Sequence, residues 1–91
     1  MFDFDLSDEL KFILKKLSKK DPKKVKIINR KIKEIISCNS DTINHYKNLR
    51  NELKEYKRVH IDRSFVLTFK VDIKNNFILF VDFEHHDKVY K

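Results

Sequence analysis

The sequence contains no glycine, alanine, glutamine or tryptophan, and only one proline and one cysteine. Without glycine it cannot form the Rossmann fingerprint, the P-loop or the EF-hand loop, because each needs backbone conformations that only glycine supplies at low cost. Those routes to nucleotide and calcium binding are therefore excluded. The single cysteine, Cys38, allows no internal disulfide and no paired-cysteine zinc framework, which indicates a reducing compartment.

Long hydrophobic runs are also missing. The longest apolar stretches, residues 65–67 and 77–81, are far shorter than the ~20 residues of a membrane-spanning helix. The N-terminal residues are acidic, whereas a secretory signal begins with basic residues. We therefore expect a cytoplasmic protein. Its 91 residues, 41% of them hydrophobic, suit one domain, residues 1–91, with a packed core.

Apolar periodicity in the first half predicts a strand followed by two helices. Residues 2–6 alternate between apolar and acidic side chains, as in a half-buried strand, and Ser7 then provides a helix N-cap. Asp21 and Pro22 end the first helix and start a second, because aspartate caps well and proline fits the first helical position. We expect Asn39 to end the second helix in a left-handed conformation.

The second half predicts three strands. Residues 41–52 have no clear period and are interpreted as a loop or short turn. From residue 53 the period falls to two, and strands are expected around residues 58–62, 65–71 and 77–83, with a turn at 72–76. The polar segment from residue 85 to 91 could form a short helical turn. The predicted order is strand, helix, helix, strand, strand, strand.

Positive charge is concentrated on the predicted helical hairpin. Residues 11–40 contain eleven Lys or Arg residues and two acidic ones, a formal charge of +9, while the first ten residues carry −4. Such a surface attracts nucleic acid, although a solvated lysine face is the alternative interpretation. The candidate residues for contact with RNA or the ribosome are Lys15, Lys16, Lys19, Lys20, Lys23 and Lys24.

All four histidines lie at or after residue 45, in the same part of the chain as Arg58 and Arg63. Attack by a ribose 2′-hydroxyl on RNA needs a base, an acid and a cation, which two histidines and an arginine can supply. Strand alternation places Arg58 and His60 on the side away from the helices. The alternatives are that an exposed histidine is only polar surface, and that Arg58 pairs with Glu55 or Asp62.

A metal site is a further alternative, because His60, His85, His86 and Asp87 are all possible ligands. Adjacent histidines in a strand point to opposite faces, which argues against both binding one ion. Serine hydrolase chemistry has no supporting motif, since no glycine elbow flanks a serine. We therefore expect neither a metal nor another cofactor.

Four runs, residues 44–50 (NHYKNLR), 56–61 (YKRVHI), 64–67 (SFVL) and 85–90 (HHDKVY), resemble in this order the RelE/ParE toxin superfamily, especially its RelE-type, YafQ-like branch. The N-terminal strand and lysine-rich hairpin are also similar. The resemblance implies an α+β fold with two helices on a small, mainly antiparallel sheet. It also implies a type II toxin that cleaves translated mRNA in the ribosomal A site without a metal, held inactive by a small, acidic, RelB-like antitoxin.

The resemblance also implies functional positions. The residues that match it are His45 in the loop, His60 in the strand, His86 near the C-terminus and the terminal aromatic Tyr90. The branch has an acidic residue four positions after the strand histidine, where this sequence has Ser64, so orientation of the base falls to Asp62 or to no residue.

The resulting hypothesis assigns a role to each group. His60 and His86 exchange protons, Arg58 and Arg63 stabilise phosphate, Tyr90 stacks on a base, and His45 assists. Two alternatives remain: a gyrase inhibitor like the ParE toxins, which share the fold but generally lack these histidines, and a basic binding module of the same fold without catalysis.

Overall fold

The computed structural model describes residues 1–49 and 55–86. Its elements are β1 (Asp3–Leu6), α1 (Asp8–Lys20), α2 (Pro22–Ile36), the short 3-10 helix η1 (Thr42–His45), β2 (Tyr56–Ile61), β3 (Phe65–Asp72) and β4 (Phe77–His85). This order confirms the predicted α+β architecture. No helix in the part of the chain that the structure describes is long and apolar enough to span a membrane.

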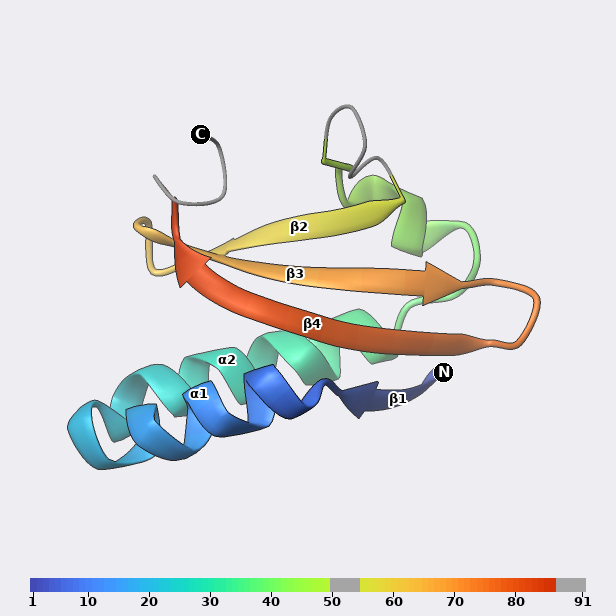
Figure 1. The fold of residues 1–91 in the computed structure, drawn as a ribbon. Coiled ribbons are helices and arrows are strands. Elements are labelled where there is room, and N and C mark those ends of the chain that lie inside the picture. The colour runs from blue at the N-terminus through green and yellow to red at the C-terminus, as the bar shows by residue number, and fades with distance from the viewer. Residues whose placement is uncertain (50–54, 87–91) are drawn as a thin grey trace.

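The four strands form one mixed sheet in the order β1-β4-β3-β2. β1 runs parallel to β4, and the two other strand pairs are antiparallel, so the sheet is mainly antiparallel as expected. Both helices lie together under one face of the sheet (Figure 1). A parallel strand pair needs a long crossover connection, and the helical hairpin provides the start of it.

Both helices begin at the predicted caps. The Ser7 side-chain oxygen accepts a hydrogen bond from the Leu10 N–H at 3.0 Å, and its hydroxyl donates to the Val81 carbonyl. The Asp21 carboxylate accepts from the Lys24 N–H at 3.2 Å, directly before Pro22. Each cap satisfies a backbone donor that the first helical turn leaves without a partner.

The prediction for Asn39 is wrong. α2 ends at Ile36, its C-cap Ser37 has a right-handed backbone (φ −80°, ψ −8°), and Asn39 does not have a positive φ. The Asn39 side-chain carbonyl instead accepts from the N–H groups of Asp41 and Thr42. The short amide side chain thus bonds to the next turn of the chain, a competing role that asparagine commonly takes outside helices.

The core lies between the helices and the inner face of the sheet. Its fully buried side chains include Leu10, Ile28, Ile35, Leu67, Phe69, Ile78 and Phe80. Because alternate residues of a strand point to opposite faces, the contribution of Val59 and Ile61 to the core places Arg58 and His60 on the outer face. The outer face of β2 therefore carries polar candidates, as the alternation predicts.

The last strand is longer than predicted. β4 continues to His85, which pairs with Phe65, two residues past the expected end at residue 83. Backbone pairing with β3 decides this boundary, and it does not depend on the polarity of the side chains. The segment predicted as a loop or turn contains η1, and Asn48 then bridges to Lys57 of β2.

Candidate functional site

His60 and His86 form a stacked pair. Their ring centroids are 5.4 Å apart and the ring planes differ by 28°. His60 is exposed in β2, and His86 is half-buried directly after β4. Imidazole is the side chain best suited to accept and donate protons near neutral pH, so the pair can supply both an acid and a base.

The sheet register explains why residues 26 positions apart meet. Phe65 pairs with Ile61 and with His85, so β2 and β4 reach the same end of the sheet. His60 pairs with Val66, which lies on the intervening strand β3 and is fully buried. The two imidazoles therefore meet across β3.

The turn between β2 and β3 completes this end of the site. Asp62 and Arg63 have left-handed backbone angles, with φ of 49° and 66°. The Ser64 carbonyl accepts a hydrogen bond from the His86 N–H at 2.8 Å. This turn, residues 62–64, is thus linked to both histidines. It continues directly from the strand that carries His60, and it is hydrogen-bonded to the backbone of His86.

The two predicted phosphate-binding arginines lie within three residues of His60 in the sequence. Arg63 is exposed within the β2–β3 turn. Arg58 shares the outer face of β2 with His60, is half-buried, and has a buried Nε atom. Arg58 pairs with Thr68, and Thr68 pairs with Asp82, so a polar row crosses the sheet beside the histidines.

Lys24 differs from the other predicted binding lysines. Its Nζ lies 3.8 Å from Asp62 Oδ2, 3.9 Å from Asp21 Oδ2 and 4.1 Å from the centre of the Phe65 ring. The Lys24 side chain is only 15% exposed, whereas Lys15, Lys16, Lys19, Lys20 and Lys23 are all exposed. The Lys24 side chain therefore points toward the β2–β3 turn, where it forms an ion pair with Asp62.

One predicted residue lies apart from the pair, and two others lie outside the residues that the structure describes. His45 is exposed at the end of η1, and the segment that follows joins the first half of β2 through the bond from the Leu49 N–H to the Tyr56 carbonyl. His45 is not part of the stacked pair. Tyr90 and Asp87 lie outside the described residues.

A polar cluster around the buried Lys57, which the sequence did not predict, supports the same strand. Lys57 is 8% exposed and donates to the Tyr46 carbonyl and to Asn48 Oδ1, both at 3.1 Å. Burial lowers the pKa of Lys57. The Tyr46 hydroxyl donates to Glu34 Oε1 at 3.2 Å, and burial together with the Glu34 carboxylate raises the pKa of Tyr46 to about 12. The sequence did contain a signal for Lys57: alternate residues of a strand share a face, so Lys57 lies on the core-facing side with Val59 and Ile61.

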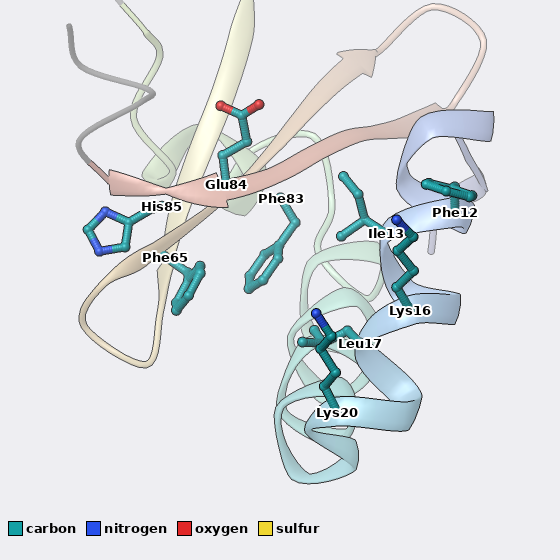
Figure 2. Close-up of a pocket in the computed structure, with 9 residues that line it drawn as sticks. All are labelled: Phe12, Ile13, Lys16, Leu17, Lys20, Phe65, Phe83, Glu84 and His85. Atoms are coloured by element: carbon teal, nitrogen blue, oxygen red, sulfur yellow. The ribbon is translucent and has the colours of Figure 1, made fainter.

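A groove of about 460 Å³ lies between α1 and the end of the sheet (Figure 2). Its lining residues are Phe12, Ile13, Lys16, Leu17, Lys20, Phe65, Phe83, Glu84 and His85. Phe12 is 59% exposed, and the Lys16 ammonium lies 4.6 Å from the centre of its ring. Aromatic rings beside lysines suit a partner that is apolar in part and negatively charged in part.

The metal site considered above includes Asp87, which lies outside the described residues. Among the described residues, the side chains close enough to share one ion are Glu9, Asp82 and Glu84, whose oxygens lie within 4.8 Å of one another. Exposed acidic groups are common without an ion. None of the described histidines belongs to this group.

Solved structures show the same architecture. A metal-bound toxin from Helicobacter pylori matches with a TM-score of 0.76 and 18% identity, over 99% of this chain and 100% of that one. The YoeB dimer from Staphylococcus aureus has a TM-score of 0.71 and 22% identity, over 93% and 97%. YafQ from E. coli has 0.67 and 15%, over the whole of both chains. The strand order, helical hairpin and sheet define a RelE-like fold.

Sequence relatives then identify the family. A protein of Methanocaldococcus jannaschii named as a toxin, RelE4, is 50% identical over 91 residues, covering 100% of this chain and 93% of its own length. An uncharacterized protein of Methanosarcina mazei is 38% identical over 90 residues, covering 99% and 100%. No family model matches the sequence. The chain belongs to the RelE family, the toxins of toxin-antitoxin systems, and the resemblance noted in the sequence is confirmed.

Proposed function

We propose that this RelE-family toxin is a ribosome-dependent, metal-independent endoribonuclease that cleaves translated mRNA in the A site and thereby inhibits translation. The observation that carries the proposal is the stacking of His60 on His86 at 5.4 Å, beside a turn that contains Arg63. Two imidazoles and a guanidinium are the groups that cleavage by an internal ribose hydroxyl requires.

The proposed reaction transfers two protons. One imidazole removes the proton of the ribose 2′-hydroxyl, and the resulting oxygen attacks the adjacent phosphorus. The other, as imidazolium, protonates the departing 5′ oxygen, which leaves a 2′,3′-cyclic phosphate and a 5′-hydroxyl. Arg58 and Arg63 stabilise the negative charge that builds on the phosphate oxygens. Tyr90 is proposed to stack on a base, and His45 to assist.

Ribosome docking is proposed for the exposed lysine face of the hairpin. Lys15, Lys16, Lys19, Lys20 and Lys23 are all exposed, so they can contact RNA phosphates without rearrangement. The site of action would then be the cytoplasm, where ribosomes translate mRNA.

The partner is a cognate antitoxin, as membership of a toxin-antitoxin family implies. We propose that it is small, acidic and RelB-like, and that part of it occupies the groove between α1 and β4. The groove combines the exposed ring of Phe12 with Lys16 and Lys20, which favours an amphipathic segment with acidic side chains.

Substitution of the paired histidines tests the catalytic proposal. His60→Ala and His86→Ala should each slow cleavage by roughly 10²-fold or more, because each removes one proton-transfer group. Ribosome affinity should stay nearly unchanged, since the proposed ribosome contacts are made by the hairpin lysines and not by the imidazoles. If the histidines act as a unit, the double variant should be little slower than the slower single variant.

The measurement is primer extension on mRNA in a translating extract, with ribosome binding measured in parallel. An unchanged cleavage pattern for either variant would remove that histidine from the mechanism. Intact mRNA with wild-type toxin, together with DNA strand breaks, would favour gyrase inhibition. If neither mRNA cleavage nor DNA strand breaks are detected, a binding module without catalysis is favoured.

A further inference from the structure

We propose that Lys24 is a positioning residue for the histidine pair. It fixes the β2–β3 turn, residues 62–64, to the helical hairpin, and it thereby keeps His60 and His86 in contact. The catalytic consequence of this proposal rests on the ribonuclease function proposed above. The geometric part does not, because the stacking of the two rings can be measured without any activity.

Lys24 is held firmly on the helical side. Its backbone N–H donates to the Asp21 carboxylate at 3.2 Å, and its Nζ lies 3.9 Å from the other oxygen of the same carboxylate. Both ends of the residue therefore contact the α2 N-cap. With its side chain only 15% exposed, Lys24 has little of the freedom that makes most surface lysines weak ion-pair partners.

On the sheet side the same ammonium contacts both ends of the turn. Asp62, the first residue of the turn, has its Oδ2 atom 3.8 Å from Nζ. Phe65, the first residue after the turn, has its ring centre 4.1 Å from Nζ. An ion pair and a cation–π contact are both stronger when water is partly excluded, as it is around this side chain.

The turn needs such support because its backbone is costly. Asp62 and Arg63 both have positive φ in a chain that has no glycine to place there. Left-handed angles in other residues persist only when the surrounding contacts hold them. Lys24 supplies one of those contacts through Asp62.

Movement of the turn would reach both histidines. His60 is two residues before Asp62 in the same chain, and His86 is bonded through its N–H to the Ser64 carbonyl at 2.8 Å. A shift of residues 62–64 away from α2 would thus displace the two imidazoles by different routes. Catalytic groups misplaced by about 1 Å can lose up to ~10²-fold in rate.

Lys31 provides a matched control within the same helix. It lies seven residues further along α2, about 10 Å away along the axis and on the same face. Its Nζ is 3.2 Å from Glu34 Oε2, and its side chain is 28% exposed. Replacing it also removes a partly buried lysine and one ion pair, but at a distance from the turn.

The experiment compares Lys24→Met, Lys24→Arg and Lys31→Met by proton NMR and by cleavage. In Lys24→Met we expect the nuclear Overhauser effect between the His60 and His86 imidazole protons to weaken by at least half. Cleavage should slow by roughly tenfold while ribosome affinity stays within about twofold. Lys24→Arg should keep both close to wild type, because arginine retains the positive charge and can form the same cation–π contact. Lys31→Met should behave as wild type.

A folded Lys24→Met protein with an unchanged histidine signal would overturn the proposal. So would a loss of ribosome affinity with a smaller salt dependence, because that result would make Lys24 a phosphate contact. If Lys24→Met does not fold, Asp62→Asn replaces it with the same expectations, since asparagine tolerates left-handed angles and removes only the charge. If the histidine signal changes as expected but wild-type protein cleaves no RNA, the ribonuclease function fails and the positioning role stands.

Discussion

Arg63 keeps a long cationic side chain at a position where the backbone favours glycine. Its φ of 66° follows a φ of 49° at Asp62. Aspartate tolerates such angles through its short polar side chain, but arginine has no comparable compensation. A strained residue at the edge of a proposed catalytic site is consistent with a functional reason for retaining it.

Arg63→Gly should separate the conformational cost from the function. We expect it to raise the free energy of unfolding by about 0.5–1 kcal/mol, because relief of the left-handed strain exceeds the added flexibility of the unfolded chain. Cleavage should nevertheless fall by roughly tenfold or more, since the guanidinium is lost. Urea denaturation and primer extension measure the two effects.

The control for this substitution is Arg63→Ala, which removes the guanidinium but leaves a Cβ atom at the strained position. It should lose cleavage to a similar extent without gaining stability. A glycine variant less stable than wild type would show that the arginine side chain makes contacts worth more than the strain.

At the scale of single elements, Ser7 joins the start of α1 to β4. Its side chain caps the Leu10 N–H and donates to the Val81 carbonyl. Ser7→Ala should lower the free energy of unfolding by about 1–2 kcal/mol, since it removes a cap and a second hydrogen bond. The measurement is urea denaturation followed by circular dichroism.

Ser18→Ala is the matched control in the same helix. The Ser18 hydroxyl donates to the Lys15 carbonyl within α1 and is exposed. Alanine has the higher helix propensity, so this variant should be as stable as wild type or slightly more stable. Equal losses in both variants would contradict a special role for Ser7.

The elements whose signals are local could be predicted from the sequence. The caps at Ser7 and Asp21 and the alternation around His60 depend on neighbouring residues, and all three are confirmed. Asn39 was misassigned because asparagine has competing local hydrogen bonds. The end of β4 at His85 was missed because pairing with Phe65, twenty residues earlier, sets it.

The site could be predicted only in part, for the same reason. The alternation of side chains along a strand predicts that Arg58 and His60 share one face. The contact between His60 and His86 depends on where β4 ends relative to the β2–β3 turn, which the sequence does not specify. The inward position of Lys24 depends on a contact with Asp62, 38 residues later, so composition alone grouped it with the exposed lysines.

At the scale of the whole molecule, charge is separated between the hairpin and the rest of the chain. Neutralising Lys15, Lys16, Lys19 and Lys20 together by glutamine should weaken ribosome binding and reduce its salt dependence. Each lost phosphate contact should lower the slope of log affinity against log salt by roughly 0.7–0.9. The fold should persist, because all four side chains are exposed.

Binding measured at several salt concentrations tests this expectation. Glutamine at Lys47 and Lys74, two exposed lysines outside the hairpin, serves as the control and should change the slope much less. A slope equal to wild type in the fourfold variant would make the hairpin lysines a solvated face only.

The parallel pairing of β1 with β4 implies an order of folding. Ser7 bonds to Val81 across 74 residues, whereas β2, β3 and β4 follow one another through short turns. Closing a long loop costs more chain entropy than closing a short one, so contacts distant in sequence tend to form late. The three-strand meander that carries His60 and His86 would therefore assemble first, and docking of the N-terminal strand would be the slow step. The strands that carry the two histidines would in that case pair before the sheet is complete.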